Sequence, residues 1–113
     1  MPEENYLDVL EQSLKKKLDI LDQIRVKNEL QKVLFLDENL EPEDLEKNLD
    51  SKAALVEQLE LLDQGFEDIY ERVRELLQKN KQQYQEQIQR LQELIRRITA
   101  ESNSIQAEEQ RNY

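Results

Sequence analysis

Residues 60–73 read ELLDQGFEDIYERV and contain Gly65, the single glycine of this 113-residue chain. A glycine here can end one helix and begin another, or it can lie inside a continuous helix. Apolar residues cross it without a change of phase, at positions 55, 59, 62, 66, 69 and 73. A turn would have no reason to preserve that phase, and glycine inside a helix costs only about 1 kcal/mol relative to alanine. The sequence therefore favours a helix that continues through Gly65, with a break there as the alternative.

Two helix starts flank this region on its N-terminal side. Proline followed by two acidic residues occurs at 2–4 and again at 42–44. Proline suits the first position of a helix, and acidic side chains suit its first turn. Between the two starts, the stretch LDENLEP at 36–42 interrupts the apolar pattern with residues that favour turns. We predict one helical domain over 1–113, with a helix at about 3–36, a loop at 37–41, a long helix at about 42–108 and a frayed C-terminal end.

The apolar spacing predicts how these helices pair. An apolar stripe follows the first helix, so that an antiparallel hairpin or coiled coil is expected. At 1.5 Å per residue the second helix would be about 100 Å long and the first about 50 Å, so pairing would end near Glu75. Beyond that point a heptad seam begins at Tyr84 and continues to Ile105. This seam requires another subunit, a client protein, or a fold-back at Gly65 into a three-helix bundle.

Composition supports the all-α class and limits the partners. Charged residues make up 37% and aromatic residues 5% of the chain, which is typical of long helices. The formal net charge of −10 argues against nucleic acid and against anionic membrane surfaces as partners. The sequence has no apolar stretch long enough for membrane insertion and no signal peptide at its N-terminus. We therefore expect a cytoplasmic protein.

The side chains needed for most catalytic and metal sites are missing. The chain contains no histidine and no cysteine, which rules out histidine-assisted nucleophiles and the common zinc ligands. It also contains no glycine-rich phosphate loop. We expect no enzyme activity, no cofactor and no metal.

Three segments resemble a known family. They are KAALVEQLELLDQGFEDIYERVRELL (52–77), YQEQIQRLQELIRRIT (84–99) and SIQAEEQRN (104–112). They are similar to the Clostridia-type branch of the FlgN-like flagellar export chaperones. In that family an Arg-Asn step like Arg111-Asn112 is followed by further helix, whereas this sequence stops at Tyr113.

The resemblance implies a function in bacterial flagellum biogenesis. It implies a cytoplasmic chaperone that binds the C-terminal segments of hook-associated proteins and delivers them to the export gate of the flagellar type III apparatus. Such binding would place an amphipathic client helix on an exposed apolar stripe. The family's client-binding region lies towards the C-terminus, and Gly65 is a candidate hinge. The candidate client-binding residues are Tyr84, Ile88, Leu91, Ile95, Ile98 and Ile105.

A structural role is the alternative. The seam from Tyr84 to Ile105 would then form a homodimer, and the chain would act as a coiled-coil tether or dimerisation module. In a tether, self-association alone should cover the seam. In a chaperone, the seam must be able to exchange its partner for a client helix.

Overall fold

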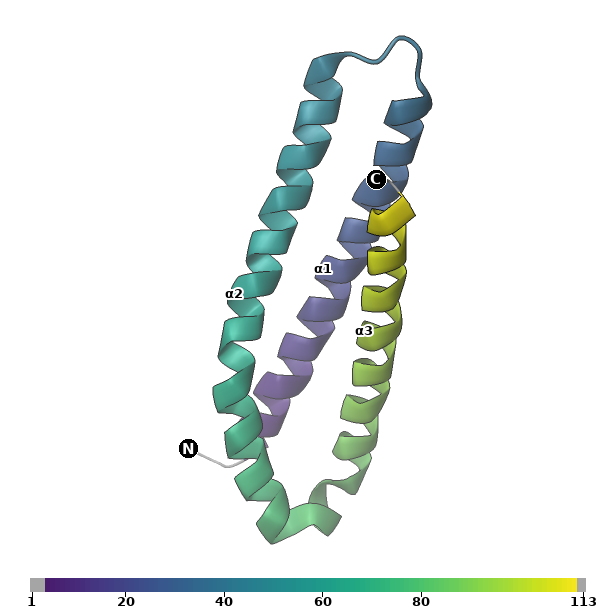
Figure 1. Ribbon diagram of the computed structural model, residues 1–113. Coiled ribbons are helices and arrows are strands. Elements are labelled where there is room, and N and C mark those ends of the chain that lie inside the picture. Colours follow the sequence, from purple (N-terminus) through teal and green to yellow (C-terminus); the bar gives the residue numbers. More distant parts are fainter. Residues whose placement is uncertain (1–3, 112–113) are drawn as a thin grey trace.

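The computed structural model describes residues 4–111, which form three α-helices and one short 3₁₀ helix (Figure 1). No strand occurs within these residues, so the predicted all-α class is confirmed. The elements in chain order are α1 (Glu4–Leu36), α2 (Pro42–Asn80), η1 (Lys81–Tyr84) and α3 (Gln85–Arg111).

The first connection lies where the sequence predicts it. Helix α1 ends at Leu36, and the Asp37 carboxylate accepts a hydrogen bond from the backbone N–H of Asn39 at 2.9 Å. This local turn competes with continued helix. Helix α2 then begins with Pro42 in its first turn, followed by Glu43 and Asp44. The start predicted at Pro2 lies outside the described residues.

Helix α2 continues through Gly65, as the apolar phase predicts. The glycine is exposed, and none of the described glycine or non-glycine residues has a positive φ angle. Phe66 and Val73 beyond it remain buried on the same face that carries Leu55. In the alternative of a three-helix bundle broken at Gly65, the position of the break is therefore wrong, whereas the three helices are present. The structure does not test whether Gly65 acts as a hinge.

The prediction of a single helix over about 42–108 is wrong, because the chain reverses direction at η1. Residues 78–83 contain no apolar side chain, so nothing in this stretch holds the helix against α1. Lys81 keeps right-handed helical angles, and the reversal is made by one tight 3₁₀ turn rather than by a left-handed cap. The molecule is consequently 60 Å long rather than about 100 Å.

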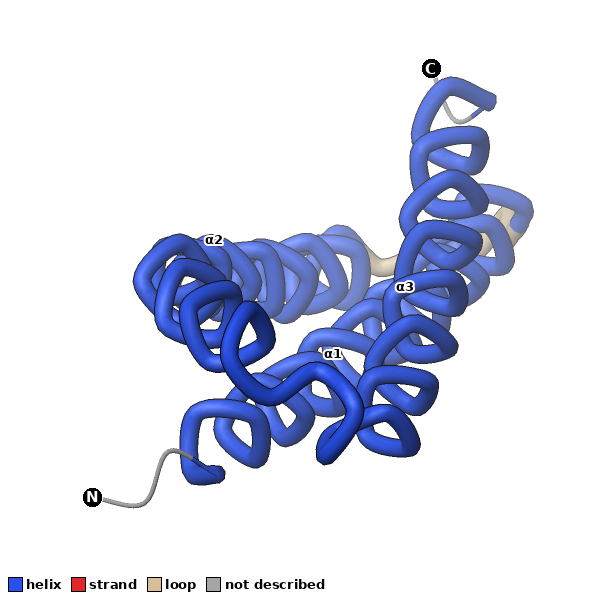
Figure 2. The backbone as a smooth tube through the Cα atoms, turned by 90° about the horizontal axis from the view of Figure 1, so that it is seen from below, coloured by secondary structure: helices blue, strands red, loops and turns tan. Residues whose placement is uncertain are grey.

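Helix α1 is the central element, and α2 and α3 pack on it from two sides (Figures 1 and 2). In the described residues no Cα atom of α2 comes within 8 Å of a Cα atom of α3. The two outer helices are joined at η1 and diverge towards the other end of the molecule, where the 37–41 loop lies (Figure 1). The radius of gyration of 17.9 Å exceeds the roughly 13 Å of a compact globule of this length.

This divergence divides the molecule into two halves. In the closed half, near η1, apolar side chains from all three helices share one core. In the open half, near the loop, a smaller apolar cluster lies between α1 and α2. The closed-half core contains Leu7, Leu10, Leu14, Leu18, Leu21, Phe66, Val73, Leu76, Leu91, Leu94 and Ile98. The open-half cluster contains Ile20, Ile24 and Leu55, with Leu59, Leu62 and Ile105 packed against it.

Candidate functional site

A large apolar groove lies in the open half, between α2 and α3. We call it the α2–α3 groove. Its volume is about 690 Å³. Helix α1 forms its floor, and the two outer helices form its walls. Its lining residues are Leu21 and Ile24 from α1, Leu49, Lys52, Ala53, Val56, Glu57, Leu59 and Glu60 from α2, and Ile105 and Glu109 from α3.

The groove exposes apolar side chains that a folded protein normally covers. Leu49 is 45% exposed and Val56 is 37% exposed, although both project from an ordered helix over a buried floor. Along α2 the lining extends from Leu49 to Glu60, which is about 17 Å at 1.5 Å per residue. That length accommodates about three turns of a further α-helix. The groove therefore has the size and polarity of a helix-docking site.

Several ion pairs, together with the apolar contacts of Ile105, hold the C-terminal part of α3 in place. Lys52 on α2 pairs with Glu109 on α3 across the groove. Arg25 on α1 donates to the Glu101 carboxylate at 2.9 Å and lies 3.6 Å from Glu108. These contacts fix the α3 wall at a distance from α2 without filling the space between them.

Charged side chains of α1 and α3 lie close together around the Arg25–Glu101 ion pair. Desolvation and the nearby Glu101 carboxylate raise the pKa of Asp22 above its ordinary value of 3.8. The hydrogen bond to Glu101 likewise raises the pKa of the Arg25 guanidinium. The Arg25 guanidinium therefore stays protonated throughout the physiological range.

A buried polar layer lies one helical turn beyond Ile24, towards the loop. Asn28 is 0% exposed, and neither atom of its amide has a hydrogen-bond partner. Asn48 on α2 is also buried and donates to the backbone carbonyl of Lys27 at 3.1 Å. The Glu108 carboxylate has one buried oxygen without a partner. Such groups cost stability, so this layer is weaker than the apolar core below it.

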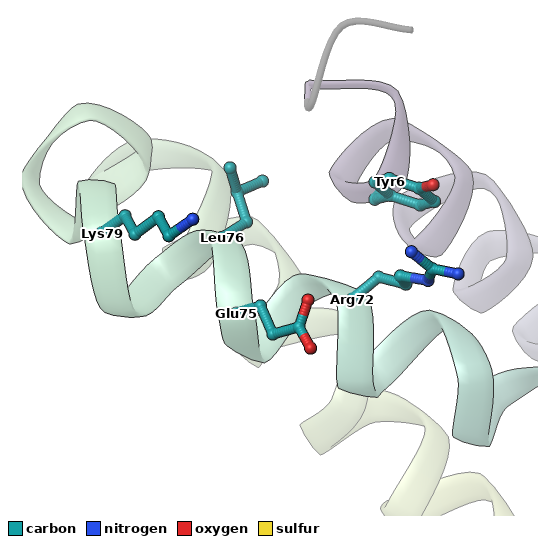
Figure 3. A pocket seen from close by; sticks show the side chains of 5 residues that line it. All are labelled: Tyr6, Arg72, Glu75, Leu76 and Lys79. Carbon is teal, nitrogen blue, oxygen red and sulfur yellow. The ribbon is translucent and has the colours of Figure 1, made fainter.

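The other cavities are less suited to a macromolecular ligand. The pocket in Figure 3 lies near η1 between the start of α1 and the end of α2, and has a volume of about 140 Å³. Tyr6, Arg72, Glu75, Leu76 and Lys79 line it. The Arg72 guanidinium lies 5.7 Å from the centre of the Tyr6 ring, which is a cation–π contact. This contact accounts for the placement of Tyr6 and Arg72 without any ligand.

The residues predicted from the heptad seam do not form one exposed surface. Helix α1 covers the inner face of the seam, so the expectation that the seam has no partner in its own chain is wrong. Leu91 and Ile98 are 5% and 7% exposed and belong to the closed-half core. Tyr84 is partly buried and packs against this core, and Ile88 lines a separate small cavity among glutamine side chains.

The last two members of the predicted set, Ile95 and Ile105, differ in their relation to the groove. Ile95 is 42% exposed but does not line the α2–α3 groove. Ile105 does line the groove and is the single residue shared by the prediction and the cavity. Whether any of the six residues contacts a client stays a prediction.

Sequence reasoning missed the α2 wall. Leu49 and Val56 fit the apolar pattern of the predicted second helix, and such a pattern predicts pairing with the first helix. The available signal was the width of that pattern. Leu55, Leu59 and Leu62 form one stripe, while Leu49 and Val56 form a second stripe one heptad apart. Two stripes on one helix exceed what a single partner helix covers.

Comparison of the chain with models of protein families, with curated proteins and with solved structures finds no match. None of the helices within residues 4–111 combines the length and the apolar content that crossing a membrane requires. The candidate function therefore rests on the groove and on the sequence resemblance.

Proposed function

We propose that this chain is a non-catalytic cytoplasmic chaperone of flagellar type III export, and that its α2–α3 groove binds an amphipathic helix from the C-terminal segment of a hook-associated protein. The observation that carries the proposal is the open, three-turn apolar groove with Leu49 and Val56 exposed on its wall. The bound segment is released to the export apparatus.

The mode of binding follows from the shape of the groove. A helix laid between α2 and α3 would complete a four-helix arrangement in the open half and would cover Leu21, Val56 and Ile105. Each apolar side chain that the client buries there contributes about 1.5–3 kcal/mol. Loss of translational and rotational freedom offsets a large part of this gain. The result is a reversible complex, which suits a chaperone that must release its client.

The sequence resemblance supplies the identity of the client. Its most distinctive parts are LDQGFEDIYERV at 62–73 and IQAEEQRN at 105–112; residues 62–73 lie on α2 and residues 105–111 lie on α3, the two helices that form the groove walls. The proposal moves the centre of client binding from the Tyr84–Ile105 seam to the α2–α3 groove, and keeps Ile105.

A pair of matched substitutions tests this proposal. Val56 and Ile95 have similar exposure, but only Val56 lines the groove. In calorimetry with synthetic peptides from the C-termini of hook-associated proteins, we expect Val56→Asp to weaken binding at least about tenfold, because it places a charge in an apolar contact. We expect Ile95→Asp to bind normally.

Different negative results of this experiment would contradict different parts of the proposal. No binding of such peptides by the unmodified chain would contradict the chaperone proposal. If Val56→Asp binds normally and Ile95→Asp loses binding, the client binds the face of α3 that carries Ile95 and does not bind the groove. Leu91→Asp is not used, because Leu91 belongs to the closed-half core and its substitution would disrupt folding.

A second candidate function is a structural coiled-coil module that self-associates. A different surface favours it. Near the loop, α1 exposes Val26, Leu30, Val33 and Leu36 on one side. Light scattering would separate the two functions, because the structural module predicts a stable dimer that Val33→Asp with Leu36→Asp converts to a monomer. The chaperone proposal predicts client binding by the monomer of this double variant.

A further inference from the structure

Some of the charged side chains that line the α2–α3 groove form ion pairs, and others do not. Lys52 and Glu109 neutralise each other across it. Glu57 and Glu60 also line the groove and are exposed. No side chain in the part of the chain that the structure describes forms an ion pair with either of these two carboxylates.

The two carboxylates lie on the same rim. They are three residues apart on α2, so their side chains project from neighbouring turns of one helix face. Their rim belongs to the α2 wall, whereas the α3 wall contributes Ile105 and the already paired Glu109. The groove is therefore apolar along its floor and negatively charged along one edge.

The acidic rim is part of a wider charge asymmetry. Residues 43–71 of α2 contain ten acidic and two basic side chains. Helix α1, in contrast, contains six acidic and six basic side chains. The field at the groove is consequently negative on the α2 side, and it attracts cationic groups of a docking partner.

We propose that the α2–α3 groove selects an amphipathic helix whose apolar face is flanked, on the side that meets α2, by lysine or arginine residues three or four positions apart. This inference rests on the proposed function and specifies the chemistry of its client. The apolar face of the partner helix contacts the floor and Val56. Its cationic flank pairs with Glu57 and Glu60, which gives the groove a preference among otherwise similar helices.

The test uses the full chain and three synthetic 14-residue helical peptides with the same leucine stripe. The peptides carry lysine, glutamine or glutamate at two positions, i and i+3, beside the stripe. In fluorescence anisotropy at low salt, we expect the lysine peptide to bind about three- to tenfold more tightly than the glutamine peptide, and the glutamate peptide to bind most weakly. Added salt should reduce this difference, because the rim is exposed.

Two double variants locate the effect. In Glu57→Gln with Glu60→Gln, we expect the three peptides to bind within about twofold of one another. The matched control is Asp68→Asn with Glu71→Gln, which removes the same charge at the same spacing from α2 outside the groove lining. In this control we expect the preference for lysine to persist.

The outcomes separate the inference from the proposed function. If the lysine and glutamate peptides bind with equal affinity, or if both double variants lose the preference equally, the inference is overturned and a helix-binding groove remains. If none of the three peptides binds, both the inference and the proposed groove function are overturned.

Discussion

The closed and open halves are built on the same central helix but are covered in different ways. In the closed half, Phe66 and Val73 from α2 and Leu91 and Ile98 from α3 meet over the leucines of α1. In the open half, α3 contributes Ile105 as its single apolar side chain to the cluster. Three glutamates of α3, Glu101, Glu108 and Glu109, also form ion pairs there.

The difference shows how one bundle combines stability with an accessible apolar site. Removal of large apolar side chains from water holds the three helices together, so the closed half supplies most of the folding free energy. Ion pairs hold helices at a distance but contribute little where they are exposed. The open half is thus kept in position by the closed half, and its apolar surface stays available.

The largest expected effect is a loss of folding stability when the closed-half core is disrupted. Leu14 is buried among side chains of the closed-half core, so Leu14→Ala should lower the free energy of unfolding by about 2–5 kcal/mol. Val56→Ala in the open half should cost less than about 1 kcal/mol, because Val56 is already partly exposed. Urea denaturation measures both. Equal losses would contradict the division into two halves.

A smaller gain is expected from the polar layer of the open half. Asn28→Leu removes a fully buried amide that has no hydrogen-bond partner and should raise the free energy of unfolding by about 1–3 kcal/mol. Asn48→Leu is the control, since it also removes a hydrogen bond to the Lys27 carbonyl and should gain less. A loss of stability in Asn28→Leu exceeding that in Asn48→Leu would show that Asn28 is satisfied in solution.

A change of about 1 kcal/mol is expected where the two halves join along α2. No atom lies within 4 Å of the Cβ that Gly65→Ala would introduce, and α2 is continuous there. The substitution should therefore stabilise the protein by about 1 kcal/mol through helix propensity alone. Thermal denaturation measures the gain. If client affinity also falls, Gly65 acts as the hinge suggested by its sequence; unchanged affinity would exclude that role.

The smallest expected effect concerns Asp22 in the open half. Its pKa is raised in the folded state, so ionised Asp22 lowers stability at neutral pH, and this cost disappears below the unfolded pKa of about 3.8. Asp22→Asn should raise the free energy of unfolding by less than about 0.5 kcal/mol at pH 7, because the site is exposed. Denaturation at pH 7 and pH 3 should show the gain at pH 7 only. A gain that persists at pH 3 would have another cause.

The helix through Gly65 and the first connection were predictable from sequence, whereas the reversal at η1 and the groove were not. Unbroken apolar phase identified the helix through Gly65, and the Pro42 start and the loop at 37–41 followed from local chemistry. The reversal at 81–84 was not predicted, because this segment contains neither glycine nor proline. Its one signal in the sequence is the absence of apolar residues from 78–83. This error left the Tyr84–Ile105 seam without a partner, although α1 covers it.

The groove could not be located from the pattern of one helix. Its floor, walls and length depend on where α2 and α3 diverge, which is a property of three packed helices. Leu49 and Val56 fit the apolar periodicity of α2. Periodicity does not distinguish an apolar side chain that packs on α1 from one that faces an open groove. Unpaired charge at Glu57 and Glu60 likewise becomes visible only when all neighbours are placed.

The central claim, that the open half binds a client helix in the α2–α3 groove, is tested most directly by methyl NMR of the unmodified chain. A C-terminal peptide of a hook-associated protein is titrated into protein with labelled isoleucine, leucine and valine methyl groups. We predict shifts for Leu49, Val56 and Ile105, with Val73 and Leu91 of the closed half unchanged. Shifts confined to the closed half, or no shifts at saturating peptide, would contradict the account.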